Sequence, residues 1–134
     1  MIPALLGSLA LGLVKGLTSG PSSDEPSDFS LQQDLVGPVT EELIYRGAPL
    51  WLWPKIPFGS TAIVIAAAHL EDDWLAAQKA GKTLTPGQVL ARLGDTFLGG
   101  LLYETAMRQS GIGAAVGAHA AHNIAITLGS RMRR

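Results

Sequence analysis

Apolar residues along the chain gather in runs of helical length, and short polar or glycine- and proline-rich stretches separate these runs. A half-buried strand would alternate apolar and polar residues with a period of two, and no segment of the sequence does so. Asn-Gly, a strong hairpin signal, is also absent. The pattern therefore predicts an all-α protein, a bundle of four to five helices within one domain.

The first apolar run, residues 1–17, predicts a helix, and a polar linker over residues 18–34 separates it from the rest of the chain. No basic segment precedes this run, so it makes a poor secretory signal peptide. Its uncharged part, residues 1–14, is shorter than the roughly 20 residues that a full membrane span needs. We interpret it as a membrane-anchoring or bundle helix, and a helix packed on a soluble core is the alternative.

The core of the predicted bundle covers residues 35–130, and residues 131–134 form a basic tail. Its first helix is expected from about residue 35 to 53, where the breaker "WPKIPFG" ends it. Thr85 and Pro86 begin a later helix, because threonine is a good N-cap and proline suits the first helical position. The glycines of "SGIG" then separate that helix from the last one.

Residues 109–130 contain no Lys, Arg, Asp or Glu, and a run of this length is long enough to span a bilayer. Small residues are dense in the last two helices, where they allow helix backbones to approach closely. They include Gly99, Gly100, Gly113 and Gly117. The positive-inside rule places the basic tail in the cytoplasm. The sequence therefore predicts a small integral membrane bundle with a cytoplasmic C-terminus.

The composition limits the chemistry that this bundle can perform. The hydrophobic fraction is 47% and the mean hydropathy is +0.26, which is high for a small soluble domain and modest for a membrane bundle. A net charge of −1 gives the chain no general attraction for nucleic acid, which we exclude as a partner. The absence of cysteine excludes disulfides, thiolate metal sites and cysteine nucleophiles. Imidazole chemistry must use His69, His119 or His122, the three histidines of the sequence.

Polar side chains inside apolar helices are costly, and they persist mostly where they pair or perform a function. The residues that stand out are Glu41, Glu42, His69, His119 and Asn123. Glu42 and Arg46 are four residues apart with the glutamate first, the favoured order for a helical ion pair. Arg46 is therefore expected to keep Glu42 ionised and to fix its side chain.

Glu41 points about 100° around the helix from its neighbour Glu42, so the two carboxylates are expected to have different environments. One is paired and the other is free to face a pocket, which is a common way to build a general base. A solvated helix start, where acids favour the helix dipole, is the alternative for this pair.

His119 and Asn123 are four residues apart on one face of the most apolar helix, and His122 lies on the same broad face. Three interpretations follow. Glutamate and two histidines could form a metal site, although the metallopeptidase motif H-E-x-x-H is absent. Glutamate could instead activate water while histidine and asparagine stabilise an oxyanion. The third interpretation is structural, with buried polar groups that fix helix register.

The segments "EELIYRG", "IAAAHL" and "HAAHN" occur in that order, the last within "FLGGLLYETAMRQSGIGAAVGAHAAHN". This resembles the CPBP family, which comprises CAAX prenyl endopeptidases and bacteriocin-processing or immunity proteins. The family pattern is a double glutamate with arginine after three residues, then Phe-x-x-x-His, then His-x-x-x-Asn or Asp. The matching residues are Glu41, Glu42, Arg46, His69, His119 and Asn123, and Ile65 replaces the phenylalanine. The resemblance covers about residues 35–130.

The resemblance implies a metal-independent intramembrane endopeptidase without a cofactor, acting on a peptide or membrane-protein substrate in the lipid bilayer. Glu41 is then the base for water, and His69 positions that water or polarises the carbonyl. His119 and Asn123 form the oxyanion site. In this scheme Arg46 orients Glu42. His122 has no counterpart in the motifs, and we assign it to packing around the site.

Family members are usually larger, with further membrane helices before the first motif. The chain is therefore expected to be a minimal core, a homo-oligomer that seals its cavity, or a non-catalytic membrane protein of structural or bacteriocin-immunity type. This last option is the main alternative to a peptidase. A zinc-dependent membrane peptidase is a third.

Overall fold

The computed structural model describes residues 2–18 and 31–132, and within these ranges the chain forms helices and no strand. The all-α prediction is therefore confirmed. The elements are α1 (Ile2–Thr18), η1 (Gln32–Val36), α2 (Gly37–Glu42), η2 (Leu43–Gly47), α3 (Ala48–Leu52), α4 (Ser60–Lys79), α5 (Pro86–Ser110) and α6 (Ile112–Met132).

The elements from η1 to α3 follow one another without a break, so residues 32–52 form one helical run that contains two π-helical turns, η1 and η2. With this run counted once, the described residues form five helices, as the sequence predicts. Most of the predicted linker, residues 19–30, and the last residues of the basic tail, 133–134, lie outside the described residues.

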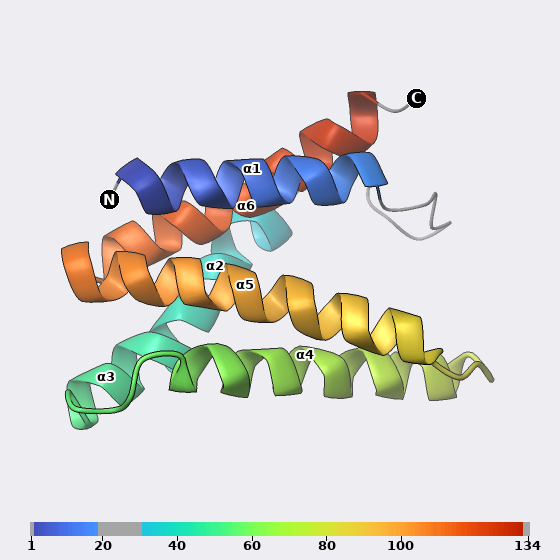
Figure 1. Cartoon of the computed structure of the whole chain (residues 1–134), viewed down its shortest axis with the longest axis horizontal. Coiled ribbons are helices and arrows are strands. Elements are labelled where there is room, and N and C mark those ends of the chain that lie inside the picture. The colour runs from blue at the N-terminus through green and yellow to red at the C-terminus, as the bar shows by residue number, and fades with distance from the viewer. Residues whose placement is uncertain (1, 19–30, 133–134) are drawn as a thin grey trace.

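Long helices pack side by side, and the run 32–52 crosses them (Figure 1). α1 lies along α6 and runs in the same direction, while α5 contacts both of these helices and also packs against α4. The run 32–52 contacts α6 through η1, α2 and η2, and it contacts α4 through η2. The segment that carries the two glutamates therefore lies between α4 and α6.

The start of α5 follows the local rule that predicts it. The Thr85 side chain accepts a hydrogen bond from the Gln88 backbone N–H at 3.2 Å, and the Gln88 side chain accepts one from the Thr85 N–H at 2.9 Å. This reciprocal capping box satisfies two backbone donors that a helix start would leave unpaired. At the other end, Gly111 has φ 82°, a left-handed conformation that favours glycine, and it separates α5 from α6.

Some glycines allow helix backbones to approach closely, but not all of the glycines for which the sequence predicted this. A Cβ atom on Gly12 would lie 2.3 Å from the His122 carbonyl oxygen, so α1 could not pack on α6 as it does. On Gly100, a Cβ would lie 2.9 Å from the Cα of Ala62 in α4. The prediction of close approach is confirmed at Gly100. It is wrong for Gly113 and Gly117, where an added Cβ would meet no atom within 4 Å.

Over residues 2–18 and 31–132, no helix combines the length and the apolar character needed to cross a membrane. The prediction that the uncharged run 109–130 spans a bilayer therefore has no support from the structure. That run falls mainly in α6, where two histidines, an asparagine and several glycines offset the aliphatic residues. A cytoplasmic position for the basic tail depended on this span and has no support from the structure.

The loop that follows Trp53 is anchored on α5 by a buried carboxylate. Glu104 is fully buried and accepts hydrogen bonds from the Gly59 N–H at 3.1 Å and from the Thr61 hydroxyl at 2.6 Å. The Arg108 guanidinium lies 2.7 Å from the other oxygen of the same carboxylate. Glu104 therefore holds the start of α4 against α5. The same contacts fix the end of the predicted helix breaker, residues 53–59.

This anchor predicts a pH dependence of stability. Burial raises the pKa of Glu104, but the hydrogen bonds from Thr61, Arg108 and Gly59 outweigh it, so the pKa lies below its ordinary value of 4.5. The anchor therefore stabilises the fold above that value and loses its effect as the pH falls through the lowered pKa.

We expect Glu104→Gln to lower the free energy of unfolding at pH 7, with a loss that shrinks as the solution is acidified. Denaturant unfolding at a series of pH values measures this. The control is Glu71→Gln, the same change on an exposed side chain. A loss that does not depend on pH would contradict the prediction.

Candidate active site

A buried ion pair lies where the run 32–52 meets α5. Glu42 ends α2 and Arg46 lies in η2, and both side chains are 0% exposed. Nη1 of Arg46 donates a hydrogen bond to Oε1 of Glu42, and Nη2 donates one to the Gly100 carbonyl at 3.2 Å. The pairing expected from the four-residue spacing therefore forms. It does so at a π-helical turn, a feature that often accompanies functional sites.

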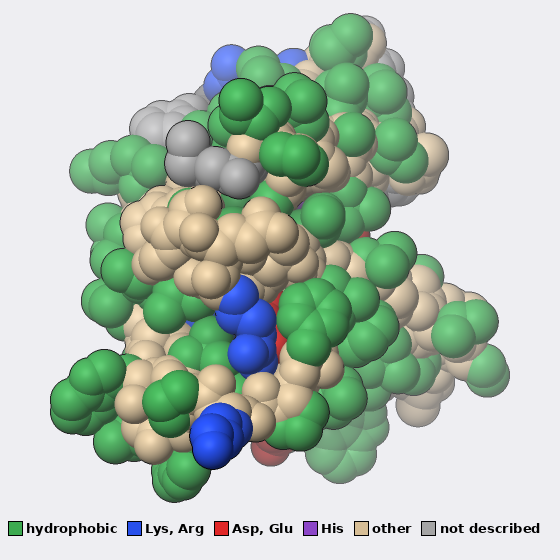
Figure 2. Space-filling view, turned by 60° about the vertical axis from the view of Figure 1, so that its left-hand side comes forward, with side chains coloured by type: hydrophobic (Ala, Val, Ile, Leu, Met, Phe, Trp, Pro, Cys, Tyr) green, Lys and Arg blue, Asp and Glu red, His purple; other side chains and the backbone are tan. Residues whose placement is uncertain are grey.

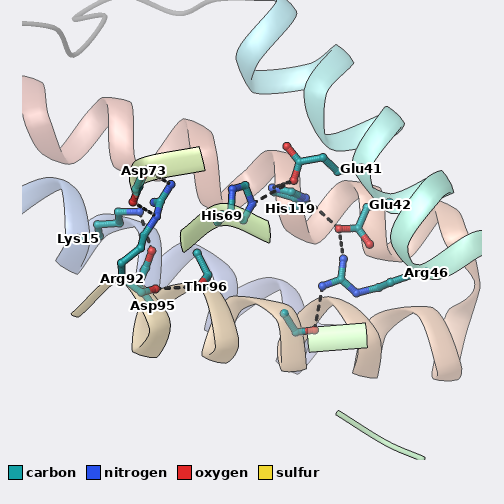
Figure 3. A network of polar contacts seen from close by, with 11 residues as sticks. Lys15, Glu41, Glu42, Arg46, His69, Asp73, Arg92, Asp95, Thr96 and His119 are labelled. Atoms are coloured by element: carbon teal, nitrogen blue, oxygen red, sulfur yellow. Dashed lines mark hydrogen bonds and ion pairs between the residues drawn. The ribbon is translucent and has the colours of Figure 1, made fainter. Parts of the chain in front are cut away.

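His119, from α6, lies between the two glutamates (Figure 3). Its Nδ1 is 2.9 Å from Oε1 of Glu42, and its Nε2 is 3.9 Å from Oε2 of Glu41. An ionised carboxylate can only accept hydrogen bonds, so Nδ1 carries a hydrogen directed at Glu42. This contact leaves Nε2 as the nitrogen that faces Glu41.

Glu41 differs from Glu42 in exposure and in its partners. Its side chain is 31% exposed, and Oε2 lies 3.5 Å from Nε2 of His69 on α4. Burial raises the pKa of Glu41, but His69, His119 and Arg46 outweigh it, so the pKa lies below its ordinary value of 4.5. Glu41 is therefore held as the ionised carboxylate, the form that a general base requires.

A cavity of about 200 Å³ brings the predicted residues together. Five of the six line it: Glu41, Arg46, His69, His119 and Asn123. The sixth, Glu42, lies behind them in contact with Arg46 and His119. A second cavity of about 290 Å³ also reaches Glu41, Ile65 and His69, and it extends to Asp72. Two cavities therefore meet at Glu41 and His69.

The other end of the first cavity carries charged residues that the sequence reasoning missed. Nζ of Lys15, from α1, lies 2.6 Å from Oδ2 of Asp95 on α5. Arg92 pairs with Asp73 on α4 at 2.7 Å (Figure 3). Lys15, Arg92 and Asp95 line the cavity. Local spacing could not reveal these pairs, because their members are far apart in the sequence and belong to different helices.

Tyr103 is a further residue that the sequence reasoning missed. It is 5% exposed, and its ring stacks on His119 with centroids 4.5 Å apart and planes inclined by 13°. The Arg46 guanidinium carbon lies 5.2 Å from the centroid of the same ring. Burial, with the negative charge of Glu42, raises the pKa of Tyr103 well above its ordinary value of 10.0. The sequence did offer a signal for this residue, because Tyr103 and Glu104 place polar groups within an apolar part of α5.

His122 contacts α1. It is 6% exposed, and its Nδ1 lies 3.2 Å from the Ser8 carbonyl oxygen. Burial lowers the pKa of His122, which favours the neutral ring. This residue had no place in the motifs, and the structure gives it a contact between two helices as well as a place on the cavity wall.

Metal ligation was one of the interpretations of the glutamate and histidine residues. Within the ranges 2–18 and 31–132, no group of three or more His, Asp or Glu side chains is arranged to hold a metal ion. The ring nitrogens of His69 and His119 instead lie 3.5 and 3.9 Å from Oε2 of Glu41.

A buried Glu–Arg pair, a second glutamate and two histidines thus lie around one cavity of the helical bundle. The family model for type II CAAX prenyl endopeptidase Rce1-like proteins matches residues 29–125, so the chain belongs to this family. The resemblance found in the sequence is thus confirmed. It is a protease family, its members are membrane proteins, and peptides are the substrates that it implies. Comparisons with curated proteins and with solved structures give no match.

Burial of the ion pair predicts how the two glutamates differ in stability measurements. Glu42→Gln leaves the Arg46 charge buried without its counter-charge, and such a change costs about 3–5 kcal/mol. Glu41→Gln makes the same chemical change on a partly exposed side chain and should cost less than about 1 kcal/mol. Denaturant unfolding of both variants measures this difference.

The double variant Glu42→Met with Arg46→Leu removes both charges together. It should recover most of the stability that Glu42→Gln loses, because no charge then remains buried and unpaired. Equal losses for Glu41→Gln and Glu42→Gln would contradict the assignment of the buried pair.

Proposed function

We propose that the chain is a metal-independent endopeptidase in which Glu41 activates a water molecule for attack on a peptide bond. The observation that carries the proposal is the position of Glu41 Oε2, on the cavity and between Nε2 of His69 and Nε2 of His119. Glu42 is unsuited to this role because it is fully buried, does not line the cavity, and its Oε1 already accepts from Arg46 and His119.

The distances around Glu41 suit a bridging water. Oε2 is buried and accepts no hydrogen bond within the described part of the chain, and the imidazole nitrogens at 3.5 and 3.9 Å lie beyond a good direct bond. A water molecule can satisfy such an acceptor by bridging it to a neighbour. We place the nucleophilic water between Glu41 and His69, which come from different helices.

The reaction follows from this placement. Glu41 takes a proton from the water while the water oxygen forms a bond to the peptide carbonyl carbon. The carbonyl oxygen then becomes an oxyanion. Glu41 then returns the proton to the departing amine as the C–N bond breaks. Asn123 donates from its side-chain amide to the oxyanion, and His119 donates from Nε2 when its ring is doubly protonated. Both residues line the cavity from one face of α6.

A role at the membrane fits the surface of the molecule. Hydrophobic side chains cover much of the face shown in Figure 2, and large exposed apolar patches often mark sites of contact with membranes or other proteins. The exposed large apolar residues include Ile2, Leu6, Val14, Leu17, Leu43, Ile44, Trp51, Trp53, Ile63 and Val64. We propose that these surfaces contact lipid, and that the substrate is itself attached to a membrane.

Activity is the direct test of the glutamate mechanism. We expect the chain in vesicles to cleave a fluorogenic farnesylated CAAX peptide, and Glu41→Gln to abolish this cleavage while the fold is retained. Asn123→Ala should lower kcat by about a hundredfold or more, as removal of an oxyanion donor does elsewhere. Chelators should leave the rate unchanged.

Three other results would each contradict this mechanism. Activity that is lost on chelation and restored by zinc would favour the metallopeptidase. No cleavage by the wild-type chain would favour the non-catalytic alternative. Equal cleavage by wild type and Glu41→Gln would leave a peptidase but contradict Glu41 as its base.

The three tryptophans provide a test of lipid contact, since all of them are exposed: Trp51 by 80%, Trp53 by 63% and Trp74 by 51%. We expect the protein to float with phosphatidylcholine vesicles. Brominated acyl chains should then quench the tryptophan fluorescence, because bromine quenches only at close range. Variants that keep one tryptophan and replace the other two by phenylalanine identify the surface in contact. An absence of both flotation and quenching would contradict the proposal.

A further inference from the structure

A series of contacts runs from α1 to the glutamates. The Ser8 carbonyl oxygen of α1 lies 3.2 Å from Nδ1 of His122 on α6. The His122 ring meets the Tyr103 ring edge-on, with centroids 6.1 Å apart and planes at 72°. Tyr103 in turn stacks on His119, whose Nδ1 is bound to Glu42. Three aromatic rings from α5 and α6 thus connect the first helix to the candidate base.

The contact of His119 with Glu42 does not by itself fix the orientation of the His119 ring plane. The contact of Nδ1 with Glu42 fixes one point of the ring, and the ring could still turn about that contact. Rotation about the Cβ–Cγ bond of histidine has a broad minimum, so this bond alone does not set the ring plane. The nearly parallel Tyr103 ring, inclined by 13°, restricts the plane. The same plane directs Nε2 toward Glu41.

Tyr103 is itself held on several sides. The Arg46 guanidinium lies over its ring at 5.2 Å, and His122 meets the ring edge-on. Gly99, one turn earlier on α5, leaves room for the phenol, since a Cβ there would lie 3.3 Å from the hydroxyl oxygen. Tyr103 therefore has little freedom to follow His119 if that ring turns.

We propose that Tyr103 is a positioning residue that fixes the plane of His119, and that α1 supports Tyr103 through His122. The proposal rests on the peptidase function proposed above and deepens it. It assigns a role to α1, which precedes the family match at residues 29–125. The docking of α1 is close, because an added Cβ on Gly12 would lie 2.3 Å from the His122 carbonyl oxygen.

Two substitutions at Tyr103 separate positioning from packing. Tyr103→Leu removes the stacked ring and should lower kcat about tenfold with little change in KM, as expected for the loss of one aromatic pair. Tyr103→Phe keeps the ring and should restore most of the rate. Tyr103→Met, which also lacks a ring, should behave as the leucine variant does, so the comparison survives if one variant folds poorly.

A second measurement does not depend on activity. The Nδ1 hydrogen of His119, held by Glu42, should give a downfield proton NMR signal in wild type and in Tyr103→Phe. The signal should broaden or disappear in Tyr103→Leu and Tyr103→Met as the ring turns. If the wild type cleaves no peptide, the peptidase function fails, and this signal still decides the positioning role. Equal signals and equal rates for Phe and Leu would overturn the proposal.

The contribution of α1 is tested with paired glycine variants of the whole chain. Gly12→Ala introduces a methyl group against the His122 backbone, and it should lower kcat and weaken the His119 signal. Gly117→Ala is the matched control on α6, because its added Cβ meets no atom within 4 Å. It should behave as wild type does. Equal behaviour of the two alanine variants would overturn the role of α1.

Discussion

The structure depends on one buried ion pair, between Glu42 and Arg46. Taking two charges out of water costs several kcal/mol for each, and only good geometry with further hydrogen bonds offsets that cost. Both side chains are fully buried here, and the partners that complete the pair come from other helices. The Gly100 carbonyl of α5 accepts from Arg46, and the His119 ring of α6 contacts Glu42. The pair therefore holds the run 32–52 against α5 and α6, because moving either helix away would break a hydrogen bond to a buried charge.

The adjacent glutamates divide two tasks between them through the geometry of the helix. A rotation of about 100° per residue turns Glu42 toward Arg46 and leaves Glu41 at the cavity. Glu42 is fully buried and fixes His119, while Glu41 is 31% exposed and faces two imidazoles. A carboxylate that is fully buried and paired with a guanidinium makes a poor base, because water has no access to it and the pairing favours its charged form. The sequence "EE" therefore supplies a buried, paired anion and a second carboxylate that faces the cavity, within a single turn.

The sequence predicted what depends on local spacing. The pair of Glu42 with Arg46 and the start of α5 at Thr85 are set within one helical turn, and both form as expected. Contacts between distant segments could not be predicted in this way: His119 lies against Glu42, 77 residues earlier, and Tyr103 stacks on His119 from another helix. The predicted membrane span, which the structure does not support, rested on a different kind of argument. Counting charges over residues 109–130 ignored histidine, asparagine and glycine, which lower hydropathy without carrying a formal charge.

The polar residues of α6 that line the cavity make this helix less apolar. His119, His122 and Asn123 reduce its apolar character, and all three line the cavity. His122 is 6% exposed and the His119 side chain is 12% exposed, so both polar rings are turned inward. Glycine at position 129 serves a second demand, since an added Cβ there would lie 2.8 Å from the Leu13 carbonyl oxygen of α1. α6 thus carries the polar groups of the site and the small residues that admit α1. In the proposed function, the exposed apolar residues of α1, η2, α3 and α4 make the contact with lipid.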